Sequence, residues 1–204
     1  MRLEAKNIGY RYRTGRWVLR NVDISLESGE VVGLTGPSGC GKTTLARILG
    51  GYQRPRWGQV WLNGAPLPRE GYRPVQLVFQ HPEKAINGHW HLSSTLREGY
   101  RPSSERLAGL GIEQQWLRRW PHELSGGELQ RFCIVRALGP GTKFLIADEM
   151  TTMLDAITQV QIWEELLDIA RQRSLGLLVV SHEARLLQRL CHRVIELPVL
   201  NNNQ

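Results

Sequence analysis

Residues 36–44 read Gly36-Pro37-Ser38-Gly39-Cys40-Gly41-Lys42-Thr43-Thr44. An apolar run at residues 31–34 precedes them and a run of helical character follows at residues 44–49, so the order is strand, glycine loop, helix. The stretch fits the phosphate-binding pattern G-x-x-x-x-G-K-[S/T]. Glycines let the backbone turn its N–H groups around a phosphate, and the helix N-terminus adds unpaired N–H groups with partial positive charge. The sequence therefore predicts a nucleoside triphosphate site.

Two side chains of this loop have predicted contacts with the nucleotide. Lys42 is expected to reach the β- and γ-phosphates, and the Thr43 hydroxyl is expected to be a Mg²⁺ ligand. A chance glycine loop is the alternative, but the strand before it and the helix after it argue against chance. Cys40 is open to two interpretations, a reactive thiol near positive charge or a small residue of the loop, and we favour the second.

Length and composition indicate a globular protein of one domain, or of one domain with a subdomain. The 204 residues are 41% hydrophobic, and no apolar run approaches the roughly 20 residues that a membrane span needs. Charged residues at positions 2, 4 and 6 argue against a signal peptide, so a cytosolic site is expected. Cys40, Cys133 and Cys191 have neither disulfide-framework nor metal-ligand spacing.

The net charge of +7 comes from 22 arginines and 4 lysines against 19 acids. An arginine excess fits nucleic acid, phosphate ligands or an anionic membrane surface, and it also fits an ordinary solvated surface. The arginines are scattered, with no run longer than Arg118-Arg119. We therefore favour the solvated surface and expect no nucleic-acid partner.

Apolar segments alternate with helical segments along most of the chain. Strands are expected at residues 3–8, 18–26, 30–35, 59–62, 75–79, 144–147, 177–180 and 194–197, and helices at about 127–138, 156–174 and 183–190. This alternation predicts an α/β fold with a mainly parallel sheet that follows an N-terminal β region. Residues 81–123 lack β periodicity, so we interpret them as a helical subdomain inserted into a core of residues 1–80 and 124–200. The polar tail 201–204 is expected to be frayed.

An apolar strand at residues 143–147 ends in two acids, Asp148 and Glu149. The carboxyl end of a central parallel strand would lie beside the phosphate loop. Asp148 is then expected to hold Mg²⁺ through water, and Glu149 to orient and activate the attacking water. Two solvated acids at a strand end are the alternative, which the phosphate loop upstream makes the weaker interpretation.

A second glycine motif stands at the start of an amphipathic helix. It reads Leu124-Ser125-Gly126-Gly127-Glu128 and supplies another helix N-terminus that can bind an anion. An ordinary turn at a helix start is the alternative. The helix that follows is expected to bury Cys133 on its apolar face, which makes this cysteine a core residue.

Taken together, these motifs resemble the nucleotide-binding subunit of an ABC (ATP-binding cassette) transporter. The similarity covers nearly all of the chain, and its motifs occur in the family's order and at its spacings: the loop 36–44, Gln80, the signature 124–128, the acids 148–149, Leu154-Asp155 and Ser181-His182. The resemblance implies a P-loop NTPase fold of the ABC type, ATP and Mg²⁺ as ligands, and ATP hydrolysis coupled to transmembrane transport.

The resemblance also implies roles for residues outside the loop. Tyr12 matches the aromatic residue that stacks on adenine, with Tyr10 as the competing candidate. Gln80 matches the glutamine that contacts Mg²⁺ and the attacking water, and His182 matches the switch histidine at the γ-phosphate. The implied catalytic residues are Lys42, Gln80, Glu149 and His182. The implied Mg²⁺ ligands are Thr43, Gln80 and, through water, Asp148.

According to the resemblance, one chain does not complete its own site. The signature residues Ser125, Gly126, Gly127 and Glu128 would face the γ-phosphate held by a second ATPase subunit. Asp155 matches an aspartate that communicates across the interface between the two subunits. Two chains, identical or different, are therefore expected to pair head-to-tail around two ATP molecules.

Three positions depart from the family pattern, and His81 and the segment 88–91 are atypical. Met150 stands where proline is usual, so the turn after the acids loses a fixed φ. Met153 stands where a small residue is common, and Glu183 follows the switch histidine where aspartate is frequent. In the atypical segment 88–91, His89 and His91 are a weak candidate for a metal pair because no third ligand is evident.

The segments 146–149 and 158–162 resemble the branch that serves oligopeptide, dipeptide and nickel importers. That branch implies integral membrane permease subunits, an extracytoplasmic solute-binding protein and a location at the cytoplasmic face of the inner membrane. A soluble ABC-type ATPase that acts on nucleic acid or ribosomes is the alternative suggested by the arginine excess. A catalytically inactive regulatory cassette is a third possibility, for which Met150 is the only indication.

Overall fold

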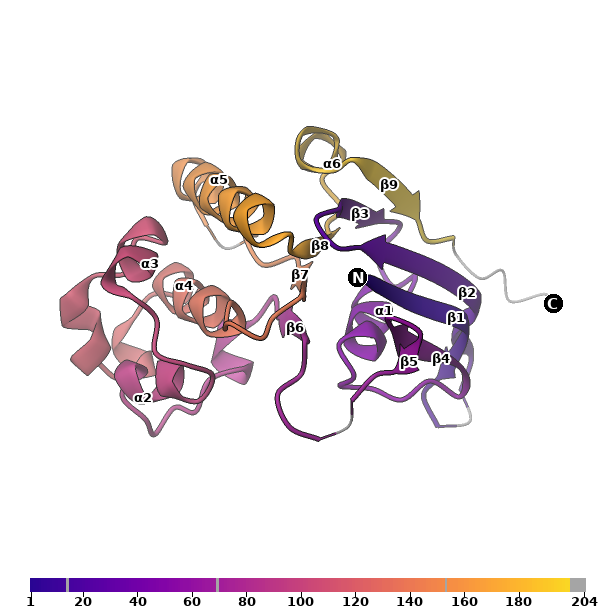
Figure 1. Cartoon of the computed structure of the whole chain (residues 1–204), viewed down its shortest axis with the longest axis horizontal. Coiled ribbons are helices and arrows are strands. Elements are labelled where there is room, and N and C mark those ends of the chain that lie inside the picture. Colours follow the sequence, from indigo (N-terminus) through magenta and orange to yellow (C-terminus); the bar gives the residue numbers. More distant parts are fainter. Residues whose placement is uncertain (14, 69, 153, 199–204) are drawn as a thin grey trace.

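The computed structural model describes residues 1–13, 15–68, 70–152 and 154–198. Met153, which departs from the family pattern, and the polar tail 201–204 lie outside the described residues. An antiparallel sheet of order β2-β1-β4-β5 forms the N-terminal β region (Figure 1). Its strands are β1 (Arg2–Arg11), β2 (Trp17–Glu27), β4 (Trp57–Leu62) and β5 (Ala65–Pro66). The turn that joins β4 to β5 is Asn63-Gly64, whose two positive φ angles suit a tight hairpin.

The second sheet is entirely parallel and has the order β6-β7-β8-β3-β9. Its strands are β3 (Val31–Thr35), β6 (Val75–Val78), β7 (Phe144–Asp148), β8 (Gly176–Val180) and β9 (Arg193–Glu196). Every residue of β7 and β8 is buried, which explains why these strands read as unbroken apolar runs. The order of the strands brings the carboxyl ends of β6, β7, β8 and β3 to one edge of the sheet.

Helices cover both faces of the parallel sheet, as the alternation of elements predicted. Alternate side chains of β7 and β8 enter two different cores: Leu145 and Leu177 pack in one core, and Ile146 and Leu178 in the other. Helix α1 (Lys42–Leu49) packs with the antiparallel sheet, and α4 (Gly126–Ala137) and α5 (Ala156–Arg173) pack on the opposite face. Figure 1 shows α4 and α5 together, away from α1. The predicted α/β fold is therefore confirmed.

Residues 81–123 form short helical elements and no strand. These elements are η1 (Pro82–Lys84), α2 (Leu92–Arg97), α3 (Ser104–Gly109), η2 (Gln114–Arg118) and η3 (Pro121–Glu123). Their apolar residues, among them Leu92, Leu107 and Trp116, belong to the same core as α4. The helical character matches the sequence, whereas the division of the chain into a core and an inserted subdomain stays a prediction. Among the described helices, including α6 (Ala184–Leu190), none is long and apolar enough to cross a membrane.

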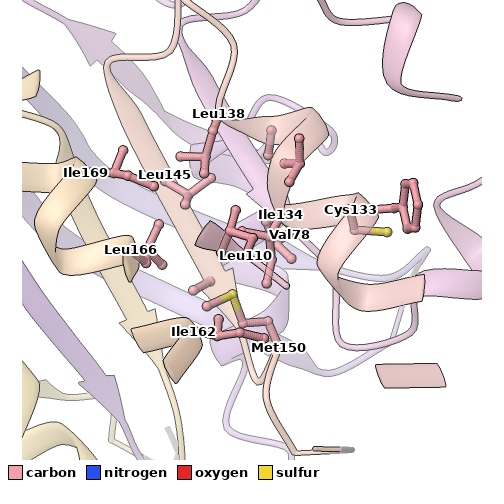
Figure 2. Close-up of a cluster of buried hydrophobic side chains, with 14 of the residues drawn as sticks. Val78, Leu110, Cys133, Ile134, Leu138, Leu145, Met150, Ile162, Leu166 and Ile169 are labelled. Atoms are coloured by element: carbon pink, nitrogen blue, oxygen red, sulfur yellow. The ribbon is translucent and has the colours of Figure 1, made fainter. Parts of the chain in front are cut away.

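The core between the parallel sheet and α4 and α5 is shown in Figure 2. Leu145 lies in this cluster with Ile134 and Leu166, and all three are fully buried. We expect Leu145→Ala to lower the free energy of unfolding by about 2–5 kcal/mol, because it leaves a cavity in a closely packed region. Urea denaturation measures this loss. Ile157→Ala, at a side chain that is 74% exposed, is the matched control and should change stability by less than about 0.5 kcal/mol.

Candidate active site

The glycine loop leads directly from β3 into α1. Gly36 and Gly41 have positive φ angles of 146° and 105°, which favour glycine. A Cβ atom on Gly36 would lie 2.6 Å from the carbonyl oxygen of Leu197, and one on Gly41 would lie 2.7 Å from Cδ2 of Leu19. The two glycines therefore let the loop pack closely against β2 and the segment after β9. Cys40 is buried, which supports the small-residue interpretation.

Lys42, the first residue of α1, turns its ammonium group toward this loop. Nζ donates hydrogen bonds to the carbonyl oxygens of Gly36 at 2.8 Å and Pro37 at 3.1 Å. Only 8% of Lys42 is exposed. A buried cation in the first turn of a helix adds to the positive charge of the helix N-terminus. The resulting positive site suits the phosphate binding that the loop sequence predicts.

Asp148, the last residue of β7, contacts Thr43 of α1. The Thr43 hydroxyl donates to Oδ1 of Asp148 at 3.2 Å. Burial raises the pKa of Asp148, while the Thr43 hydrogen bond acts in the opposite direction. A hydroxyl and a carboxylate oxygen are hard ligands of the kind that Mg²⁺ prefers, and a cation beside them would favour the ionised form of Asp148. The donor atoms therefore fit the predicted Mg²⁺ site.

Glu149 lies between two of the other predicted catalytic side chains, Gln80 and His182. Its Oε2 accepts a hydrogen bond from Nε2 of Gln80 at 3.0 Å, and its Oε1 lies 3.3 Å from Nδ1 of His182. The three residues follow the adjacent strands β6, β7 and β8, which explains how positions far apart in the sequence meet. This arrangement holds one carboxylate at two points, so it is oriented as a general base must be.

The backbone of Glu149 has a left-handed φ of 48°, which is uncommon for a residue with a long side chain. Its N–H donates to the carbonyl oxygen of Val180 at 3.0 Å, and its own carbonyl accepts from Oγ1 of Thr152 at 3.0 Å. Met150, which stands where the family usually has proline, is buried in the core shown in Figure 2. Core packing by Met150 and these hydrogen bonds thus stabilise the turn without a proline.

The two candidate adenine-stacking residues differ in exposure. Tyr10 is 9% exposed, and its hydroxyl accepts a hydrogen bond from Gln53. Tyr12 is 49% exposed, lies beside α1 and places its hydroxyl 3.2 Å from Oγ1 of Thr44. A stacking platform needs an exposed ring face near the phosphate loop, so these environments favour Tyr12.

The signature residues form the N-terminus of α4. Ser125 Oγ accepts the N–H of Glu128 at 3.3 Å, and Oε2 of Glu128 accepts the N–H of Ser125 at 2.7 Å. This capping box explains the residue types at the helix start. A Cβ atom on Gly127 would lie 2.7 Å from Cδ2 of Leu154, so glycine lets the signature approach the segment that leads to Asp155. Helix α4, which begins with this motif, and helix α1 cover opposite faces of the parallel sheet.

Asp155 is the N-cap of α5, and its Oδ1 accepts the N–H of Thr158 at 2.9 Å. This hydrogen bond lowers the pKa of Asp155. The residue is exposed, as a role across a subunit interface would require.

A metal pair at His89 and His91 gains no support from the structure. Among the described residues, no group of three or more His, Cys, Asp or Glu is arranged to hold a metal ion. The ring of His91 packs instead against Trp120, with 4.0 Å between the two ring centroids. This contact gives His91 a packing role.

Sequence reasoning missed Gln130 on α4. Gln130 is buried, and its Nε2 donates to the carbonyl oxygen of Phe79 at 3.0 Å, directly before Gln80. It therefore links the signature helix to the strand end that carries Gln80. A polar residue between the apolar residues Leu129 and Phe132 was the available signal.

Cys133 lies on the same helix, in the core. Burial raises its pKa to about 12, so the thiol stays protonated at neutral pH. The expectation that this cysteine is a core residue is confirmed.

Comparison with known proteins identifies the family. The sequence model of the family described as ABC transporter matches residues 19–152, which is more than half of the chain. The chain belongs to the ABC transporter family. Its fold, its phosphate loop and the acids at the end of β7 are those of the family's ATP-hydrolysing subunit, so the chain is an ABC transporter ATPase.

Curated relatives and a solved structure agree with this family. The nickel import ATP-binding protein NikE of Escherichia coli K12 is 37% identical over 92% of this chain and 76% of its own. NikE of Rhodospirillum rubrum is 35% identical over 96% of this chain and 80% of its own. The solved structure of the ATP-binding cassette MJ0796, a dimer in a post-hydrolysis state bound to ADP and Pi, has a TM-score of 0.83, 26% identity and coverage of 98% and 97% of the two chains.

Proposed function

We propose that this ABC transporter ATPase powers the import of nickel, a peptide or a similar small solute. Support for import comes from relatives that are named for nickel import and share up to 37% of their residues over 92% of this chain. The resemblance of segments 146–149 and 158–162 to the oligopeptide, dipeptide and nickel branch points to the same direction of transport. The comparisons lend no support to a soluble ATPase that acts on nucleic acid or ribosomes.

The observation that carries the proposed chemistry is the position of Glu149 between Gln80 and His182. We infer that Glu149 accepts the proton of the attacking water and that Gln80 and His182 hold its carboxylate in place. Thr43, Gln80 and, through water, Asp148 would hold Mg²⁺. When bound, Mg²⁺ would supply positive charge to the phosphates. Lys42 and the loop N–H groups would hold the β- and γ-phosphates, with Tyr12 on the adenine. Such intact machinery argues against an inactive regulatory cassette.

The proposed working unit contains two ATPase subunits. The signature 125–128 begins a helix that packs on the face of the sheet opposite α1, so its N-terminus is free to serve the nucleotide of another subunit. Asp155, exposed beside it, would then contact the partner. Binding of ATP would close the pair, and hydrolysis would reopen it, because one bridging nucleotide becomes two anions that repel each other. The partner is an identical or a related chain.

Transport requires further proteins. We propose that the pair docks on integral membrane permease subunits at the cytoplasmic face of the inner membrane. A solute-binding protein outside the membrane would deliver the solute. Selectivity for the solute would then reside in those proteins, because this chain supplies only the nucleotide sites.

The experiment that tests this proposal is reconstitution with the membrane proteins encoded beside the gene. The complex is placed in proteoliposomes, the solute-binding protein is enclosed with radiolabelled nickel or a labelled dipeptide, and ATP is added on the side of the ATPase. We expect ATP-dependent movement of one of these solutes toward the ATP, with no movement when EDTA removes Mg²⁺. The same complex carrying Glu149→Gln is the matched control and should be inactive.

Two outcomes would contradict the proposal. Movement of solute away from the ATP would make the complex an exporter. ATP hydrolysis at the full rate by the chain alone, without any response to permease or solute, would remove the reason to assign it to a transporter complex.

A further inference from the structure

Arginines that are scattered along the sequence gather at one edge of the antiparallel sheet. Residues 5–22 and 31–69 hold ten of the 26 Lys and Arg residues and none of the 19 acids, so the rest of the chain has 16 bases against 19 acids. Pairing of β1 with β4 joins the two segments, because Gly9 faces Trp57, and within the first segment Arg11 faces Trp17. We call this region the basic-aromatic edge and define it by Arg11, Arg13, Arg16, Trp17, Arg54, Arg56 and Trp57.

Two tryptophans form the aromatic part of the basic-aromatic edge. The rings of Trp17 and Trp57 stack at 4.3 Å between centroids, and the guanidinium of Arg11 lies 4.8 Å from the centre of Trp17. Trp57 is 56% exposed. A Cβ atom on Gly9 would lie 2.9 Å from Cε3 of Trp57, so the glycine makes room for the pair. The sheet thus presents a large indole to its surroundings instead of burying it.

Four arginines of this edge carry exposed charges. Arg13, Arg16, Arg54 and Arg56 are all exposed, and within the described part of the chain no ion pair involves any of them. Their charges therefore add to one positive field around the tryptophan pair. The exposure of these four arginines agrees with the interpretation of the arginine excess as a solvated surface.

The basic-aromatic edge adjoins a groove beside Gln80, where the family resemblance implies that the permease subunits dock. The segment between α1 and β4 carries Arg54 and Arg56, and it also supplies Gly51 and Tyr52 to a groove of about 740 Å³ that reaches Phe79, next to Gln80. In Figure 1 the strands β4 and β5 lie below β3, whereas α6 lies at the upper edge of the molecule. Arg54 and Arg56 therefore lie in the same short segment as two residues that line the groove.

We propose that the basic-aromatic edge binds the anionic phospholipid head groups of the membrane beside the permease. The inference rests on the proposed function for the presence of a membrane beside the ATPase. Guanidinium groups bind phosphate through paired hydrogen bonds, and tryptophan prefers the depth of the head groups, so both residue types of the edge suit this surface. Anionic lipid attracts basic residues that lie close to it. The ATPase thereby has a membrane contact of its own in addition to its contact with the permease.

The test is sedimentation of the purified full chain with vesicles that contain no permease. We expect binding to vesicles of phosphatidylcholine mixed with phosphatidylglycerol, weakening with added salt, and little binding to phosphatidylcholine alone. The double variant Arg13→Gln/Arg16→Gln should bind about thirtyfold more weakly, because each basic residue near an anionic surface contributes about 1 kcal/mol. The matched control, Arg185→Gln/Arg189→Gln on α6, removes the same charge from the opposite edge and should bind like the wild type. Trp57→Ala should also weaken binding.

Four results would overturn the inference. Equal binding of the wild type to both kinds of vesicle would show that anionic lipid is not recognised. If the α6 control lost as much vesicle binding as Arg13→Gln/Arg16→Gln, the basic-aromatic edge would have no specific role. Release of the vesicles by saturating ATP would assign the arginines to the nucleotide site, and tighter binding of a single-stranded oligonucleotide than of vesicles would make the edge a nucleic-acid surface. Failure here leaves Mg²⁺-dependent ATPase activity and solute uptake untouched, so it is distinguishable from failure of the proposed function.

Discussion

A Glu149→Gln variant is expected to bind ATP with nearly unchanged affinity, to dimerise in its presence and to hydrolyse it about 10²–10⁴-fold more slowly, a range typical for loss of a general base. Glutamine keeps the size of the side chain and an oxygen that accepts from Gln80. It has no carboxylate to take the proton of the attacking water. This change of one functional group should therefore leave ATP binding intact while it slows ATP hydrolysis.

Single-turnover phosphate release measures the chemical step, and size-exclusion chromatography with ATP and Mg²⁺ measures the dimer. Glu164→Gln, at an exposed acid of α5, removes the same charge away from the site and should hydrolyse ATP at the wild-type rate. Turnover of Glu149→Gln near the wild-type rate would exclude Glu149 as the general base. Loss of ATP binding in this variant would instead assign Glu149 to the binding of the nucleotide.

The second large effect concerns Lys42. We expect Lys42→Ala to weaken ATP binding by roughly a hundredfold or more, because the phosphate charge loses a buried cationic partner at the start of α1. Its ammonium group also donates to the carbonyls of Gly36 and Pro37, so the variant is expected to loosen the loop. Both changes weaken the binding of the phosphates, and neither changes the expected contact between adenine and Tyr12.

Isothermal titration with ATP and with adenosine separates these contributions. The loss should appear for ATP, whereas adenosine, which lacks phosphates, should bind equally to variant and wild type. Lys84→Ala, at an exposed lysine of η1, is the control for a general loss of charge and should bind ATP normally. An unchanged dissociation constant for ATP in Lys42→Ala would rule out the role assigned to this lysine.

Much of the fold could be predicted because its signals are local. The alternation of apolar and helical segments indicated a parallel sheet, and β7 and β8 are buried on both faces as such a sheet requires. The glycines at 36 and 41 indicated a loop that needs positive φ, and the structure has it. The fold class and the family were accordingly readable from the chain, whereas the roles of the individual site residues remain predictions.

The neighbours of Glu149 could not be derived from the residues alone. Gln80 and His182 lie 69 and 33 residues away from it, and their contact depends on the strand order β6-β7-β8. A spacing along the chain does not specify which strands pair, so only the family resemblance pointed to these two residues. The choice between Tyr10 and Tyr12 was open for a similar reason, because exposure is decided by packing around each ring.

By itself, the sequence determined the phosphate loop, the acids at the end of β7 and the capping box of α4, because backbone conformation and hydrogen bonds within a few residues are sufficient to form them. Only the tertiary structure decided that Gln80 and His182 hold Glu149 and that the signature stands on the face opposite α1. It also decided that arginines from two separate segments share one edge with Trp17 and Trp57. Electrostatic fields depend on distance in space, and β-sheet pairing sets those distances.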